Sequence, residues 1–296
     1  MSTTSDAPIV HLDAYCGPEI ARRALAAGES KTTLPFLPTF ILGILAGVYI
    51  AFAAAFFTVI TTDSGLGFGT TRLLGGLGFC LGLVLVVVGG AELFTGNTLI
   101  IMAWLSGRVN TGRLLRNWAI VYLGNLVGSL LLVALVAGSG HWGMDKFGVG
   151  AMAVTIAVKK VSLTWPAALC SGVLCNALVC LAVWMCYSAR STTDKIMAII
   201  FPITAFVAAG FEHCVANMYF IPAGLVAMLD QRVLAVLPPG TDAASLTWET
   251  FVTRNLIPAT LGNIIGGAVM VGAVYWVAYI LPDHRRERLA AKERCE

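Results

Sequence analysis

Residues 90–97 read GAELFTGN, and residues 210–217 read GFEHCVAN. Both stretches follow the pattern G-x-E-x4-N, and both lie within long apolar segments. Each places a carboxylate, Glu92 or Glu212, where a bilayer would have its hydrocarbon, and the second adds His213. A charged side chain that faces lipid at that depth costs at least about 2.5–3.5 kcal/mol. The two stretches therefore need polar surroundings inside an apolar protein.

The rest of the sequence is that of an integral membrane protein. Of its 296 residues 58% are apolar and only 12% are charged, whereas soluble domains carry about 25% charged residues. Six apolar runs are long enough to cross a hydrocarbon core of about 30 Å. They lie at residues 39–61, 73–105, 117–137, 165–187, 196–229 and 255–281.

The second and fifth runs are too long for a single crossing. A straight helix through either of them would reach about 50 Å at 1.5 Å per residue. We therefore expect two broken helices, each with a non-helical stretch at its G-x-E-x4-N motif that lines a cavity.

A second motif pair reveals an internal repeat. Residues 116–128 and 254–266 both follow R-N-x6-G-N-x2-G, and each follows a G-x-E-x4-N motif. Three spans per half is an odd number, so the halves must have opposite orientations in the membrane. Such inverted repeats place the transport site near the midplane between the breaks. The second half-helices, expected after Asn97 and near Asn217, would point positive N-terminal ends inward and favour an anion.

The distribution of Lys and Arg predicts the orientation. With six spans, one side holds 13 of these residues and the other holds 6. The positive-inside rule then places both termini in the cytoplasm, as for a multi-pass protein of the inner (plasma) membrane. We expect a cytoplasmic segment at 1–35, a channel domain at 36–282 and a basic tail at 283–296. A short amphipathic helix is expected at 18–28, either on the headgroups or over a pore or subunit contact.

These motifs resemble the formate–nitrite transporter family. The similar stretches are residues 90–97, 117–128, 176–194 and 211–222. The resemblance covers about residues 36–282, and residues 184–195 look more like the formate channels than the nitrite or hydrosulfide branches. It implies an aquaporin-like protomer, a homopentamer, a separate pore in each protomer, and permeation by formate or related weak-acid anions.

The resemblance also assigns roles to individual residues. His213 matches a central pore histidine, Thr95 a threonine of a mobile loop, and Lys160 a lysine that attracts anions. Two asparagines match residues near the pore centre: Asn176 and Asn217. An outer constriction is matched by Phe79, Val179 and Phe206. An inner constriction is matched by Leu83, Leu93 and Phe94.

Simpler roles remain open for several of these residues. Thr95 could cap a helix, and Lys160 could anchor the protein at the headgroups. Glu92 and Glu212 are expected to accept hydrogen bonds from backbone N–H groups of the breaks, because a bare carboxylate would repel an anion. His213 is expected to share a proton with the permeant, so that the anion crosses apolar rings as a neutral acid.

Other functions are weighed against formate transport. Nitrite, hydrosulfide or lactate suit the same pore chemistry, whereas a water or glycerol channel would typically carry Asn-Pro-Ala at the breaks. A membrane-embedded redox enzyme would need several histidines within its spans, and an intramembrane serine protease would need a Gly-x-Ser-Gly turn. Cysteines in the apolar runs form no C-x-x-C pair. We expect membrane lipids as neighbours and no enzyme activity, metal, cofactor or nucleic-acid partner.

Overall fold

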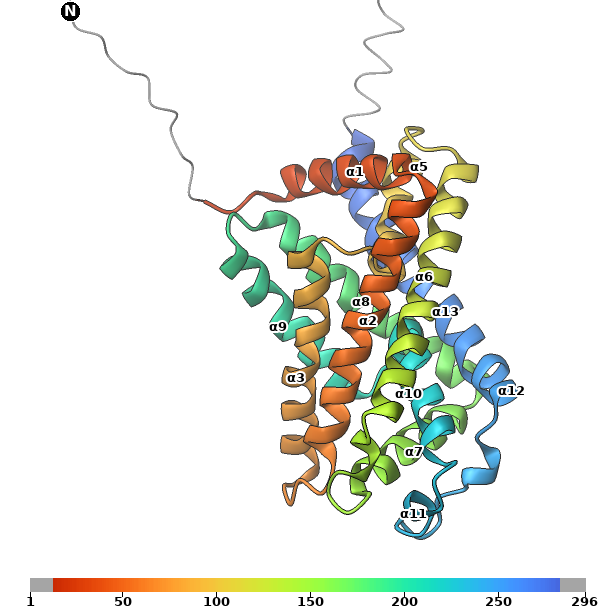
Figure 1. The fold of residues 1–296 in the computed structure, drawn as a ribbon. Coiled ribbons are helices and arrows are strands. Elements are labelled where there is room, and N and C mark those ends of the chain that lie inside the picture. Colours follow the sequence, from red (N-terminus) through yellow and green to blue (C-terminus); the bar gives the residue numbers. More distant parts are fainter. Residues whose placement is uncertain (1–12, 283–296) are drawn as a thin grey trace, which may run out of the picture.

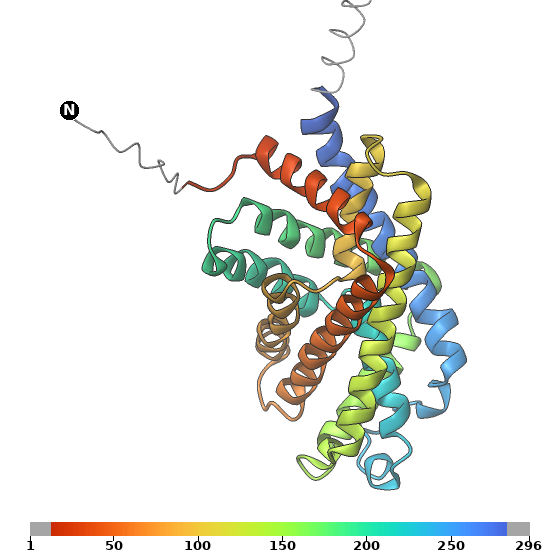
Figure 2. The same cartoon turned by 45° about the horizontal axis from the view of Figure 1, so that its top comes forward.

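The computed structural model describes residues 13–282. Residues 1–12 of the predicted N-terminal segment and the whole predicted tail at 283–296 lie outside this range. Within it, six helices are long and apolar enough to cross a membrane. They are α2 (Phe36–Thr61), α3 (Phe68–Gly89), α6 (Thr111–Gly138), α8 (Trp165–Ser188), α9 (Thr192–Ala209) and the continuous helix Trp248–Ile280. The described chain starts and ends at the same end of the bundle (Figures 1 and 2).

Both predicted helix breaks are present. The second run consists of α3, a non-helical stretch at 90–93, and a short helix made of α4 (Phe94–Asn97), η1 (Thr98–Ile100) and α5 (Ile101–Leu105). The fifth run consists of α9, a non-helical stretch at 210–213, and α10 (Cys214–Ala227). Gly90 and Gly210 end α3 and α9 with φ values of 75° and 79°, a left-handed conformation that glycine adopts at little cost. The leading glycine of each motif is thus the stop signal of the first half-helix.

The second half-helices begin earlier than the sequence suggested. Leu93 and His213 are the N-cap residues, so Asn97 and Asn217 lie one turn inside the helices. The last span is also longer than predicted, because α12 (Trp248–Thr250) leads directly into η4 (Phe251–Leu256), α13 (Ile257–Ile264), η5 (Ile265–Ala273) and η6 (Trp276–Ile280).

Each half begins with an additional helix. α1 (Gly17–Thr33) precedes α2, and its buried face includes Ile20, Ala24 and Leu25. It packs on α5, α8 and η6 at one end of the bundle (Figure 1). α7 (Gly148–Val161) precedes α8 at the other end and was not predicted, because its 14 residues are too few to read as a span. The remaining short helices, η2 (His141–Gly143), α11 (Gln231–Leu234) and η3 (Ala243–Ser245), lie in loops.

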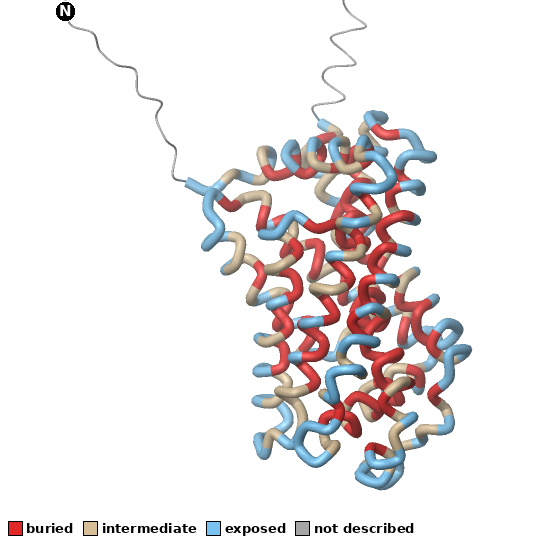
Figure 3. The backbone as a smooth tube through the Cα atoms, viewed as in Figure 1, coloured by how far each residue is buried: buried red, intermediate tan, exposed pale blue. Residues whose placement is uncertain are grey.

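Close helix contacts depend on the glycines of the repeated motif. A Cβ atom at Gly124 of α6 would lie 2.9 Å from the carbonyl oxygen of Phe40 in α2. In the other half, a Cβ atom at Gly262 of α13 would lie 2.9 Å from the backbone nitrogen of Val173 in α8. Glycine at these positions therefore lets the backbones of neighbouring helices approach closely. Figure 3 shows the resulting pattern, with buried residues along the centre of the bundle and exposed ones on its outer surface.

Candidate functional site

A buried polar network surrounds the first helix break. Lys31, at the end of α1, lies 2.6 Å from a carboxylate oxygen of Glu92. The other oxygen of Glu92 accepts from the side-chain amide of Asn97 at 2.6 Å, and this amide also donates to Asn117 at 3.0 Å. Asn117 in turn donates to the backbone carbonyl of Lys31 at 3.2 Å. The network therefore joins α1, the break and α6.

The second break is surrounded by the same network. Lys160, at the end of α7, lies 2.9 Å from a carboxylate oxygen of Glu212. The other oxygen of Glu212 accepts from Asn217 at 2.7 Å and from Asn255 at 2.8 Å. Asn255 also donates to the backbone carbonyl of Lys160 at 3.0 Å. The inverted repeat thus includes the helices α1 and α7 as well as the six spans.

The predicted partners of the two carboxylates were wrong. Glu92 and Glu212 bind Lys and Asn side chains, and the first amide of each second half-helix is satisfied by a different Asn. The N–H of Phe94 donates to Asn125 at 2.9 Å, and the N–H of Cys214 donates to Asn263 at 2.9 Å. A buried carboxylate is costly without a cation, whereas a neutral amide acceptor is enough for a backbone N–H.

His213 occupies the point where the two breaks meet. Its Nδ1 atom accepts from the backbone N–H of Ala216 at 3.1 Å, so His213 caps α10. Its Nε2 atom lies 2.9 Å from the hydroxyl oxygen of Thr95. Because Nδ1 acts as an acceptor, the proton of the neutral ring resides on Nε2 and points to Thr95. Thr95 lies inside the first turn of α4 instead of capping it, so the capping alternative is wrong.

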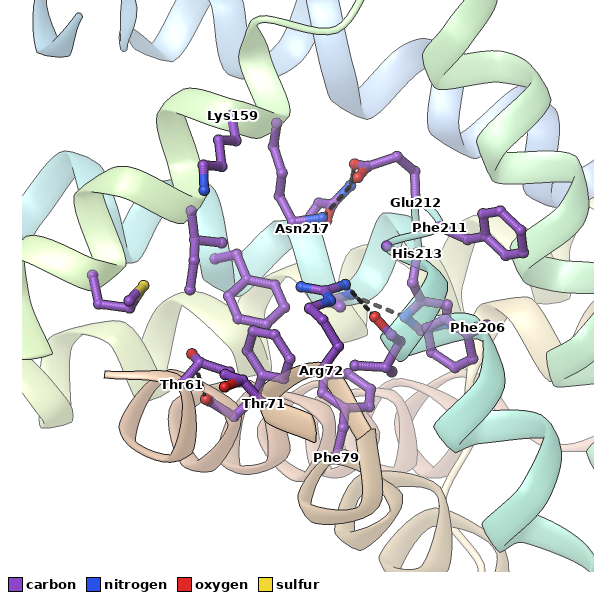
Figure 4. A pocket seen from close by; sticks show the side chains of 18 of the residues that line it. Thr61, Thr71, Arg72, Phe79, Lys159, Phe206, Phe211, Glu212, His213 and Asn217 are labelled. Carbon is purple, nitrogen blue, oxygen red and sulfur yellow. Dashed lines mark hydrogen bonds and ion pairs between the residues drawn. The ribbon is translucent and has the colours of Figure 1, made fainter. Parts of the chain in front are cut away.

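Two pockets approach this point from opposite ends of the bundle. We call them the α7-side pocket and the α1-side pocket, after the flanking helices. The α7-side pocket has a volume of about 380 Å³, and Phe79, Phe206 and His213 are among the residues that line it (Figure 4). The α1-side pocket has a volume of about 350 Å³ and includes Leu83 and Leu93.

A small apolar cavity separates the two pockets. It holds only about 10 Å³ and is lined by side chains that were predicted to form the constrictions, together with His213 and two isoleucines. The lining residues are Ile50, Phe79, Leu83, Leu93, Val179, Ile203, Phe206 and His213. Five of the six predicted constriction residues therefore meet around this cavity.

Phe94 is the exception. Its ring packs edge-on against Tyr122, with centroids 4.9 Å apart, and against Trp118 of α6. Leu93 is the extended N-cap residue and lines the cavity, whereas the Phe94 ring faces α6. Phe94 therefore lies outside the lining of this cavity, and its constriction role stays a prediction.

The remaining predicted residues lie close to the break but differ in access. Lys160 and Asn217 line the α7-side pocket. Asn176 is fully buried and donates to the carbonyl oxygens of Thr95 and Asn263, at 3.2 and 2.6 Å, so it fastens α8 to α4 and α13.

Two important residues were missed by sequence reasoning. Lys31 had a detectable signal, because residues 31–36 and 160–165 share the pattern K-x2-L-x-[FW] five residues before α2 and α8. Arg72, near the start of α3, projects into the α7-side pocket (Figure 4). It belongs to neither repeated motif, and nothing in its sequence neighbourhood marks it.

Two inverted half-proteins whose broken helices meet between two opposed pockets define a membrane transport protein. The chain belongs to the formate/nitrite transporter family, since the family model described as "Formate/nitrite transporter" matches residues 18–277. The chain is therefore an integral membrane transporter, and the enzyme alternatives are set aside.

Similar proteins agree with this assignment. Formate channel FocA of Escherichia coli (strain K12) is 46% identical over 265 residues, which cover 88% of this chain and 93% of that protein. Formate channel FocA of Haemophilus influenzae is 44% identical over 249 residues, which cover 80% and 85%. A solved structure described as a pentameric formate channel with formate bound is 44% identical, with a TM-score of 0.77, and the match covers 83% of this chain and 98% of that one.

Proposed function

We propose that this chain conducts small weak-acid anions, formate above all, through the path from the α7-side pocket past His213 to the α1-side pocket. The observation that carries the proposal is the position of His213. It is the polar side chain in the lining of the narrow apolar cavity between the two pockets. An anion would lose most of its hydration in this narrow apolar cavity, which costs several kcal/mol without a compensating partner.

The proposed chemistry is a proton transfer from the imidazole ring of His213 to the permeating anion. When His213 is an imidazolium, its Nε2–H bond breaks and an O–H bond forms on formate, which leaves neutral imidazole and formic acid. The neutral acid then passes the apolar side chains and loses its proton to water in the far pocket. His213 takes up its additional proton from water at Nδ1, which opens the cap on Ala216. After the transfer the neutral ring carries its proton on Nδ1, and it returns to the resting form when Nδ1 loses that proton to water and Nε2 takes one up.

Formate is proposed ahead of nitrite, hydrosulfide and lactate for two reasons. The proteins that are 44–46% identical are named formate channels, and the cavity of about 10 Å³ favours the smallest carboxylate over lactate.

We further propose a homopentamer with one pore in each protomer. The solved relative that is 44% identical is described as pentameric, and both pockets are formed within one chain. The α1 side is proposed to face the cytoplasm, because the order of six spans in the sequence assigns 13 of the 19 Lys and Arg residues to that side.

The test is flux into proteoliposomes for formate, nitrite, hydrosulfide and lactate, each at pH 5.5 and 7.5 (about one unit on either side of the ordinary pKa of histidine). Formate is expected to enter fastest. The variant His213→Asn keeps a side-chain oxygen that can cap α10 but cannot titrate, so formate flux should fall and lose its pH dependence. Unchanged flux and unchanged pH dependence in that variant would refute the role of His213.

A further inference from the structure

The α7-side pocket holds three cationic side chains and one carboxylate, so its net charge is +2. The cations are Arg72, Lys159 and Lys160, and the carboxylate is Glu212. Lys160 lies 2.9 Å from Glu212, and only 15% and 3% of these two side chains are exposed. The charge of Lys160 is therefore largely neutralised by its partner. Lys159 is exposed to solvent, which screens its charge.

Arg72 is different, because its charge is half-buried and has no acidic partner within residues 13–282. Its Nε–H donates to the carbonyl oxygen of Ala208 at 3.0 Å, and one Nη2–H donates to the carbonyl oxygen of Val207. These carbonyls belong to the last turn of α9, whose dipole favours a cation. The guanidinium is thus held in place without being neutralised.

This geometry leaves part of the guanidinium free. An arginine side chain has five N–H donors, and two of them serve α9. The three that remain are one on Nη2 and two on Nη1. Adjacent N–H groups on Nη1 and Nη2 form a planar fork that matches the two oxygens of a carboxylate. The ammonium group of a lysine offers no such fork.

The position of Arg72 suits an anion that is about to enter the ring. The same pocket is lined by Phe79 and Phe206, which also line the narrow cavity beneath it. Figure 4 shows Arg72 projecting into the pocket on the same side as His213 and Phe206. With an offset of 120 residues between the halves, the counterpart of Arg72 is Thr192. The cations that line the α1-side pocket are Arg23, Lys31 and Lys195.

We propose that Arg72 is the docking residue of the α7-side pocket, where its free N–H fork binds a bent oxyanion such as a carboxylate before the anion reaches the ring. This inference rests on the proposed function, since it names a binding step on the same path. Lys160 then contributes mainly to the structure of the break, and Arg72 supplies the charge that an incoming anion meets.

The experiment compares three variants of the full chain in proteoliposomes: Arg72→Gln, Arg72→Lys and Lys159→Gln. Initial rates for formate and for hydrosulfide are measured over a range of concentrations, which separates half-saturation from maximal rate. Arg72→Gln is expected to raise the half-saturating concentration about tenfold for both anions. Arg72→Lys keeps the charge and loses the fork, so it should raise the value about threefold for formate and leave hydrosulfide unchanged. Lys159→Gln removes an exposed charge from the same pocket and should change both values less than twofold.

Several outcomes would overturn the proposal. The first is an unchanged half-saturating concentration for formate in Arg72→Gln, when the wild-type protein carries formate. The second is an equal loss of maximal rate for both anions at a constant half-saturating concentration. The third is failure of both Arg72 variants to assemble. Either result would limit the role of Arg72 to holding α9 in place. A wild-type protein that carries hydrosulfide but not formate would instead refute the proposed function, and Arg72→Gln would still be expected to raise the hydrosulfide value.

Discussion

The two halves of this molecule build the same polar scaffold but place different side chains at its centre. Lys31 binds Glu92 in one half as Lys160 binds Glu212 in the other. The next residue along the chain is Leu93 in the first half and His213 in the second. The repeated residues hold the breaks open, and the proposed chemistry depends on His213, at a position where the halves differ.

The helices that follow Leu93 and His213 also differ in structure. Leu93 cannot cap the helix that follows it, and α4 has four residues before it tightens into η1. His213 caps α10 through Nδ1, and α10 runs regularly for 14 residues. A side-chain cap stabilises a helix by about 1 kcal/mol. One side chain thus contributes both to the stability of a half-helix and to the lining of the pore.

The largest expected effect comes from removing this difference with His213→Leu, which copies the first half into the second. The variant loses the Nε2–H donor at the ring as well as the cap on Ala216. Formate flux in proteoliposomes is expected to fall about 100-fold. A fall of this size corresponds to a barrier raised by about 2.7 kcal/mol, which is a modest part of the cost of dehydrating an anion without a partner.

His213→Asn is the matched control, because it restores the cap without the imidazole. Thermal unfolding in detergent should show that His213→Leu loses about 1 kcal/mol relative to His213→Asn. If the leucine variant carried formate at the wild-type rate, the difference between the halves would have no functional meaning.

A second, smaller effect compares the two ion pairs. Glu212 and Lys160 have side-chain exposures of 3% and 15%, whereas Glu92 and Lys31 have 7% and 26%. Removing the carboxylate leaves a lysine without its partner, and the cost rises as solvent is excluded. We expect Glu212→Gln to lower the free energy of unfolding by about 3 kcal/mol and Glu92→Gln by about 1 kcal/mol.

Thermal and urea unfolding of the two purified variants, measured side by side, will check this order. A larger loss for Glu92→Gln would show that exposure does not govern the strength of these pairs. Equal losses would indicate that the two halves are equivalent in energy as well as in connectivity.

Much of the fold could be predicted from the sequence, because breaks in membrane helices leave a strong pattern. An apolar run of 33 residues that contains Glu92 cannot be a straight helix in a bilayer, and repetition of the motif then fixes the inverted topology. The helix α7 was missed because its 14 residues are too few for a span and carry two lysines at one end.

The site was predicted less completely, and the failures have a common cause. Hydrogen-bond partners depend on which side chains the fold brings together, and sequence spacing does not determine this. The pattern R-N-x6-G-N-x2-G marked Asn125 and Asn263 as repeated but did not show that they accept from the breaks. Arg72 lies 135 residues from Val207, whose carbonyl it binds, and no local pattern connects the two.

The smallest expected effect concerns Phe94, whose counterpart in the second half is Cys214. Both backbone N–H groups donate to an Asn, but the Phe94 ring packs on Trp118 and Tyr122 of α6 and lies away from the narrow cavity. Phe94→Leu should therefore change formate flux less than about twofold while costing about 1 kcal/mol of stability through lost ring packing. Leu93→Phe, one residue earlier, adds bulk to a cavity of about 10 Å³ and should reduce flux about tenfold. Faster formate entry in Phe94→Leu by fivefold or more would show that Phe94 forms part of the constriction.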